Sequence, residues 1–127
     1  MIVKHPIVEH RVRTLPRQFS WIDHRLVRDG HIRRCTVAGA ALYLFLVTVG
    51  DAKGLSYYAD ASITHRLSMD EARLQAARNN LIAADLIAFT PPLYQVLSLH
   101  APEKPRQALS EPMSLAAIFK NATGGLP

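Results

Sequence analysis

The stretch LSYYADASITHRLSMDEARLQAARNNLIAADLIAFTPPLYQVLSL, from Leu55 to Leu99, carries the signals that decide the fold. It opens with strand-forming residues at Leu55–Tyr58 and continues through two segments of helical character. It closes with two apolar, strand-like runs, Leu86–Phe89 and Leu93–Leu99, on either side of a Pro-Pro corner. The order strand, helix, helix, strand, strand predicts an α+β fold that is mainly helical and ends in a small β-hairpin.

The first of the two helices is short. Asp60 is a suitable N-cap, because its carboxylate can accept a hydrogen bond from a free backbone amide of the first turn. The helix is predicted over Ala61–Leu67, with Ile63 and Leu67 on its buried face.

The second helix follows after a tight turn and begins at either Ser68 or Asp70, where the letters SMDE match a capping box. Leu74, Ala77 and Leu81 recur at spacings of three and four and predict its buried face. The outward side is predicted to carry Arg73, Ala76, Asn79, Asn80 and Ala83, with Ala72 and Gln75 at its flank.

Upstream lies the most apolar segment of the chain, VAGAALYLFLVTV at Val37–Val49, which Thr36 can cap. Because it is apolar almost all round, it is predicted to be the central buried helix. Its length falls well short of the roughly 20 residues that cross a bilayer. We therefore expect no membrane partner. The single cysteine, Cys35, predicts a reducing compartment and hence a cytoplasmic location.

Basic residues concentrate at the N-terminus of the 127-residue chain. Residues 1–34 hold eight Lys and Arg against three acids, a net +5, whereas the remainder holds seven of each sign. The eight are Lys4, Arg11, Arg13, Arg17, Arg25, Arg28, Arg33 and Arg34. Such arms commonly follow phosphate backbones, where each neutralised phosphate releases counterions. A solvated, solubilising tail is the alternative interpretation.

These shifts in composition divide the chain into three parts: a basic arm at 1–18, a folded domain at 19–99 and a Pro-rich linker with a short tail at 100–127. Phe19 and Trp21 open the domain, and core packing is favoured over base stacking for both rings. Asp23 is a plausible cap for a brief helix that ends near Arg28. The tail has a candidate helix at 110–122 that bears Met113 and Phe119.

The sequence offers little for catalysis. Cys35 is the single cysteine, so no disulfide can form within the chain. It could be grouped with His24 and His31 as metal ligands, together with Asp23 or His10, but their spacing matches no metal signature. Phosphate-binding glycine loops and nucleophile motifs are also missing from the sequence. We expect neither an enzyme nor a cofactor nor a metal site.

The segment Leu67–Ile87 resembles the second half of many bacterial winged helix-turn-helix regulators, although Asp85 stands where those proteins usually carry glycine. The wider stretch 19–99 is similar to the N-terminal domains of plasmid replication initiators and DnaD-type primosomal proteins. The shared features are a buried LYLFL-like helix, a Gly-rich exit and a Ser-Tyr strand. The resemblance implies a winged helix-turn-helix that binds double-stranded DNA through the Met69–Ala84 helix.

On that resemblance, the outward residues of the helix would face the major groove, where Arg pairs with guanine and Asn or Gln with adenine. Arg66 and Thr64 would lie near phosphates, and the arm would follow the backbone or enter the minor groove. The implied DNA-binding residues are Arg73, Gln75, Asn79, Asn80, Arg66, Thr64, Arg11, Arg13 and Arg17. Because Val37–Leu99 has a net charge of −1, DNA binding would depend heavily on the arm.

Two functional hypotheses follow. The first is a DNA-binding protein that acts in transcription regulation or as an accessory of DNA replication in a bacterium or mobile element. The alternative is a winged-helix protein-interaction or assembly module without direct DNA readout, in which the neutral helix face and the Met113/Phe119 tail bind a partner chain. A homodimer is compatible with either hypothesis.

Overall fold

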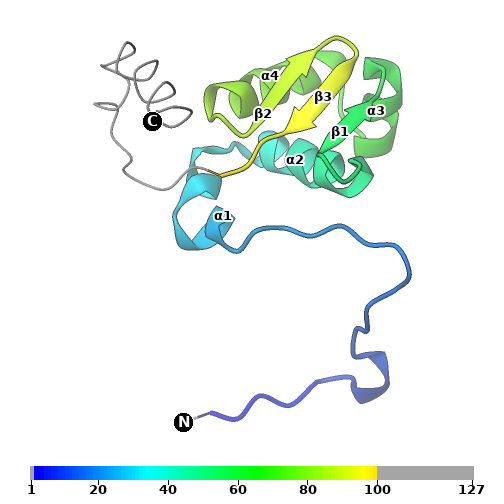
Figure 1. The fold of residues 1–127 in the computed structure, drawn as a ribbon, viewed down its shortest axis with the longest axis vertical. Coiled ribbons are helices and arrows are strands. Elements are labelled where there is room, and N and C mark those ends of the chain that lie inside the picture. The colour runs from blue at the N-terminus through cyan, green and yellow to red at the C-terminus, as the bar shows by residue number, and fades with distance from the viewer. Residues whose placement is uncertain (1, 100–127) are drawn as a thin grey trace, which may run out of the picture.

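The computed structural model describes residues 2–99, which form an α+β fold (Figure 1). The order strand, helix, helix, strand, strand predicted for Leu55–Leu99 is confirmed. The elements are η1 (Glu9–Arg11), α1 (Arg25–Arg28), η2 (His31–Arg34), α2 (Val37–Val49), β1 (Leu55–Tyr57), α3 (Asp60–Leu67), α4 (Glu71–Ala83), β2 (Ile87–Thr90) and β3 (Leu93–Val96), where η marks a single 3-10 turn. The tail predicted at 100–127, with its helix, lies outside the described residues.

The sheet is antiparallel and has the strand order β1-β3-β2. β3 pairs with β2 through a tight hairpin, with Ile87 opposite Val96, and with β1 on its other side, with Ser56 opposite Tyr94. Side chains alternate between the two faces along β3, and Tyr94 points into the core, where its side chain is fully buried. The strand predicted to run to Leu99 ends earlier, at Val96, beyond which a single ladder bond joins Leu97 N–H to the Leu86 carbonyl.

Helix caps explain where two of the helices begin. Thr36 Oγ1 accepts from Gly39 N–H at the start of α2, as predicted. Of the two starts left open for α4, Asp70 is the one observed, since its carboxylate accepts from Arg73 N–H at 2.7 Å. Ser68 instead ends α3 in the left-handed conformation. The predicted capping role of Asp60 is wrong: Ala59 occupies the cap, and the Asp60 carboxylate faces Arg78.

The core lies between α2, α3, α4 and one face of the sheet, and α2 packs mainly against α4. Leu42 and Leu46 of α2 are fully buried, as are Leu74 and Leu81 of α4. The prediction that α2 is the central helix of the core is confirmed, although its apolar surface is not buried on every side, because Leu44 is 57% exposed. The other elements cover α2 from one side, so its opposite side remains at the surface.

The N-terminal arm stands clear of this body (Figure 1), and every residue from 2 to 20 is exposed. The arm joins the body where Ser20 Oγ donates to the Thr48 carbonyl at the end of α2. The prediction that Phe19 and Trp21 pack in the core is wrong, since they are 59% and 74% exposed. Across residues 2–99 we found no helix with the length and apolar character needed to span a membrane.

Candidate nucleic-acid interface

Helix α4 presents one continuous solvent-exposed face. Leu74, Ala77 and Leu81 turn inward as predicted, so the opposite side of the helix is open to water. The exposed face consists of Ala72, Gln75, Ala76, Asn79 and Ala83, which are spaced three and four residues apart. It is neutral, and its three alanines allow a close approach by a flat or grooved partner surface.

Two of the predicted readout residues lie at the flank of this face. Arg73 and Asn80 are seven residues apart and therefore share one side of α4. Arg73 is exposed, as are Gln75 and Asn79. Asn80 is half-buried, and its predicted outward placement is wrong. Its Oδ1 accepts from Thr36 N–H at 2.9 Å and its Nδ2 donates to the Arg34 carbonyl at 2.9 Å.

These two hydrogen bonds fix the segment Arg34–Thr36 against the C-terminal half of α4, seven residues along the helix from Arg73. Arg33 and Arg34 are both exposed, and the Arg34 guanidinium donates to His31 Nδ1 at 2.9 Å. Sequence reasoning counted both arginines as part of the basic N-terminus but did not place them here. No local signal in the sequence indicated this contact, because the groups that Asn80 binds are more than forty residues away in the chain.

Arg78 lies on the same helix as Arg73, but its side chain is buried whereas that of Arg73 is exposed. Arg78 is 6% exposed, and its Nη1 donates to Asp60 Oδ1 at 2.9 Å and to Tyr94 Oη at 2.7 Å. Its guanidinium also lies 4.5 Å above the centre of the Phe89 ring, which in turn stacks on Tyr94. Burial raises the pKa of the Tyr94 hydroxyl, although the adjacent Arg78 charge acts to lower it. Arg78 therefore ties α4 to α3 and to the sheet.

The two residues predicted near phosphates both lie on α3. Arg66 is exposed and its Nε approaches Ser62 Oγ at 3.4 Å. Thr64 is half-buried, and its hydroxyl donates to the Ala61 carbonyl at 3.1 Å within the helix. Arg66 is thus accessible to a ligand, whereas the hydroxyl of Thr64 already has an acceptor.

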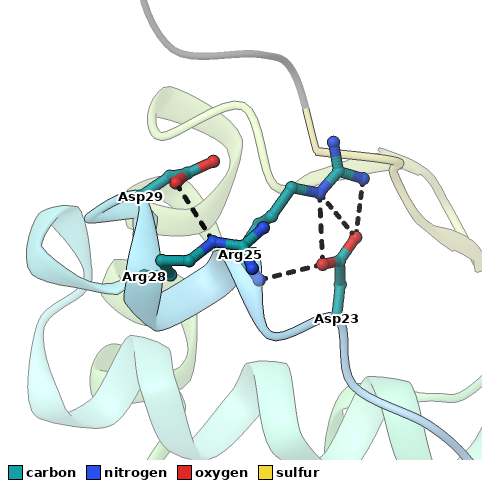
Figure 2. A network of polar contacts seen from close by, with 4 residues as sticks. All are labelled: Asp23, Arg25, Arg28 and Asp29. Atoms are coloured by element: carbon teal, nitrogen blue, oxygen red, sulfur yellow. Dashed lines mark hydrogen bonds and ion pairs between the residues drawn. The ribbon is translucent and has the colours of Figure 1, made fainter.

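Ion pairs engage two of the other basic residues (Figure 2). The Asp23 carboxylate accepts from Nε and Nη2 of Arg25, the shortest distance being 2.7 Å, and Arg28 Nε lies 3.7 Å from Asp29. The Arg25 side chain, together with the Arg25 backbone N–H, lowers the pKa of Asp23 from 3.8 to about 2. The positive charge of α1 is therefore largely matched by adjacent carboxylates.

The arm arginines are placed differently. Arg11, Arg13 and Arg17 are exposed on the extended segment, and they form no ion pair within residues 2–99. The arm leaves the body beside α2 and stands away from α4 (Figure 1). The structure thus does not bring the arm arginines together with the α4 face, and any ligand that touches both must extend around the body.

A groove of about 730 Å³ lies where the arm meets the body. The exposed rings of Phe19 and Trp21 form one wall, Tyr43 and Val47 of α2 another, and the Gly50–Gly54 turn with the end of β3 closes it. The groove is partly apolar, and Asp23 and Lys53 are on its walls.

The residues considered as metal ligands do not assemble. Among residues 2–99 no three His, Cys, Asp or Glu side chains are grouped closely enough to hold a metal ion. Burial raises the pKa of the Cys35 thiol, with the charge of Arg34 acting in the opposite direction. The thiol is consequently less ionised at neutral pH than an exposed cysteine.

The chain matches no family model, and no curated protein or solved structure matches it.

Proposed function

We propose that the protein binds double-stranded DNA as a winged helix-turn-helix, with α4 as the recognition helix and the β2–β3 hairpin as a short wing. The order of the elements and the sheet order β1-β3-β2 support this assignment. Such a module would suit a small transcriptional regulator or a replication-initiation accessory.

The observation that carries the proposal is the neutral exposed face of α4 with the exposed Arg73 at its flank. Asn80 holds the Arg34 backbone against the same helix, and the side chains of Arg33 and Arg34 are exposed. Phosphate contacts from the flank would fix the position of the helix, and Gln75 and Asn79 would reach base edges. The small side chains of Ala72 and Ala76 would let the helix enter the groove deeply.

The arm would supply most of the long-range attraction. Its basic side chains are exposed on an extended segment that can follow a phosphate backbone around the body. Because α1 is largely neutralised by Asp23 and Asp29, the proposal assigns phosphate contacts to other exposed cations of residues 2–99, namely those of the arm, Arg66 of α3 and Arg73 of α4.

The first experiment measures binding of a random-sequence duplex at several salt concentrations. We compare the full chain with a variant in which Lys4, Arg11, Arg13 and Arg17 are all changed to Gln. The variant should bind more weakly. The plot of log K against log salt has a negative slope, and its magnitude should decrease by up to about 3.6, or about 0.9 for each lost phosphate contact. A matched control changes the ion-paired Arg25 and Arg28 to Gln and should alter the slope less. Failure of the full chain to bind at low salt would refute DNA binding.

The second experiment concerns sequence readout. Once a preferred site has been selected from random duplexes, Asn79→Ala should reduce discrimination at one base pair by about 1–3 kcal/mol. Ala83→Ser, on the same face, is the control for a neutral change. If Asn79→Ala leaves the preferred sequence unchanged, the assignment of α4 to base readout is wrong.

One observation favours the alternative, a protein-interaction module. The exposed α4 face bears no charge, and the adjacent Ile82 is 42% exposed, which suits an apolar partner surface. Under this alternative Asn79→Arg would weaken partner binding, whereas under the DNA proposal the added charge would strengthen binding to random duplex.

A further inference from the structure

The groove between the root of the arm and the body exposes two large aromatic rings. Phe19 is 59% and Trp21 is 74% exposed, and both line the groove together with Tyr43 and Val47 of α2. The volume of the groove, about 730 Å³, is in the range of sites that enclose a ligand or several side chains. Exposed apolar rings on the wall of such a hollow are typical of a binding surface.

The groove carries no net charge. Two carboxylates on its walls, Asp23 and Asp51, are balanced by Arg25 and Lys53. Asp23 is paired with Arg25, and Asp51 accepts backbone hydrogen bonds from the N–H groups of Lys53 and Leu55. Both carboxylates are thus satisfied within the body. A matching occupant is therefore a segment that is apolar in its centre and nearly neutral as a whole.

The C-terminal segment of the chain begins at this groove. Leu99 is one of the lining residues and is 9% exposed, so residues 100–127 follow directly from the groove wall. Thirteen residues, His100–Pro112, separate Leu99 from the apolar run MSLAAIF at Met113–Phe119. A linker of this length spans at most about 45 Å. The apolar run is therefore tethered close to the groove of its own chain, at an effective concentration in the roughly millimolar range.

The chemistry of this segment matches that of the groove. The apolar run has no charged residue, and residues 100–127 as a whole hold three Lys and Arg against two Glu, a net +1. In the helix predicted from the sequence at 110–122, Leu115, Ile118 and Phe119 lie at i, i+3 and i+4 and would share one side. Two aliphatic side chains and one ring on that side would cover the two exposed rings of the groove.

We propose that residues 110–122 fold back onto their own body and place this apolar side in the groove, over Phe19 and Trp21. A second copy would offer its segment only at the micromolar concentration of a dilute solution, whereas the tethered segment is present at roughly millimolar concentration. Docking within one chain is therefore favoured over exchange between copies. The docked segment would strengthen the root of the arm, which the hydrogen bond from Ser20 Oγ to the Thr48 carbonyl joins to α2.

The test uses Trp21, which is the only tryptophan of the chain and lies on the groove wall. It is made on the full chain without DNA, so its outcome is independent of the DNA-binding proposal. Changing Ile118 and Phe119 together to Asp should raise the acrylamide quenching constant of Trp21 at least about twofold, because burying two carboxylates among apolar side chains is costly. The control, Gln107→Asp with Ala108→Asp, adds the same charge to the linker and should leave the constant unchanged. Equal quenching of the wild-type chain and the Ile118/Phe119 variant, or an equal effect of the control, overturns the proposal.

A second measurement distinguishes docking within one chain from docking on a second copy. In a Cys35→Ala background, Asn121→Cys carries a nitroxide label next to the apolar run. The label should broaden the indole N–H resonance of Trp21 when label and isotope are on the same chain. In a mixture of nitroxide-labelled chains with isotope-labelled chains that lack the nitroxide, the resonance should stay sharp. Broadening in the mixture would place the segment on a second copy, and no broadening in either sample would place it away from the groove. Either result overturns the proposal.

Discussion

Arg78 in the body and the arginines of the arm show how differently one residue type is used in this molecule. Arg78 is enclosed by Asp60, Tyr94 and Phe89, and each of its main contacts joins α4 to another element. Arg11 and Arg13 lie on an exposed segment and form no ion pair within the described residues. The buried guanidinium contributes to the stability of the fold, whereas the exposed ones are available to a ligand.

Net charge is therefore a poor guide to a binding surface until each cation has been placed in the structure. Arg78 adds to the formal charge of α4 but contributes nothing to its exposed face. Arg25 and Arg28 are paired with adjacent carboxylates. Among the described residues, the exposed arginines of the arm, Arg66 of α3 and Arg73 of α4 belong to separate parts of the structure.

The largest effect should come from removing the buried arginine. Arg78→Ala leaves the Asp60 carboxylate and the Tyr94 hydroxyl without their shared donor. It should lower the free energy of unfolding by about 2–4 kcal/mol, somewhat less than for a fully enclosed pair, because the Asp60 side chain is 36% exposed. Urea denaturation provides the measurement, and Arg73→Ala on the exposed side of the same helix is the control. Equal losses from the two variants would contradict the contrast between them.

A smaller loss is expected at the junction of α2 and α4. Asn80→Ala leaves the Thr36 N–H and the Arg34 carbonyl without partners, which should cost about 1–2 kcal/mol in thermal or urea denaturation. Gly39→Ala tests the same contact from the other side, since its added methyl would overlap Asn80 Oδ1. Asn79→Ala, one residue away and exposed, should change stability by less than about 0.5 kcal/mol. A large loss of stability from Asn79→Ala would show that Asn79, rather than Asn80, holds the helix in place.

The third prediction concerns the effect of low pH on the Asp23–Arg25 ion pair, which lies where the arm joins the body. The pKa of Asp23 is lowered from 3.8 to about 2, so its pairing with Arg25 favours the folded state fully above about pH 4. That contribution is lost as the pH falls toward 2 and the carboxylate is protonated. The side-chain carboxyl resonance should titrate with a midpoint near 2 and move toward 3.8 in Arg25→Gln. An unshifted midpoint in the wild-type chain would mean that the Arg25 contact in Figure 2 does not persist in solution.

The smallest effect on stability should come from the arm. Changing Arg11, Arg13 and Arg17 together to Gln should leave the free energy of unfolding within about 0.5 kcal/mol of the wild-type value, because these exposed side chains form no ion pair within residues 2–99. Differential scanning calorimetry of the full chain without DNA makes the comparison. Loss of more than about 1 kcal/mol would show that the arm cations stabilise the free protein.

Local chemistry made much of the fold predictable. The range predicted for α2 agrees with the structure residue for residue, because Thr36 and the Gly50 turn bound a continuous apolar run. Asp85, which stands where the similar regulators usually carry glycine, has φ at +63°, a left-handed conformation that aspartate tolerates better than most residues. The buried residues of α4 followed from their spacing alone.

The candidate site was predictable only where exposure follows from helical period. Gln75 and Asn79 lie outward as the spacing indicates. Asn80 does not, because the groups that hold it, at Thr36 and Arg34, are more than forty residues away in the chain. The capping role expected of Asp60 failed for the same reason: its partner, Arg78, comes from another helix.

By itself, the sequence determined the order of the elements, the start of α2 and the concentration of cations at the N-terminus, since these depend on neighbouring residues and on composition. Only the tertiary structure decided which cations are free, that α2 has an exposed side, and that Phe19 and Trp21 lie at the surface. The burial and pairing of a side chain depend on which segments pack against it, and those segments are often distant in the chain.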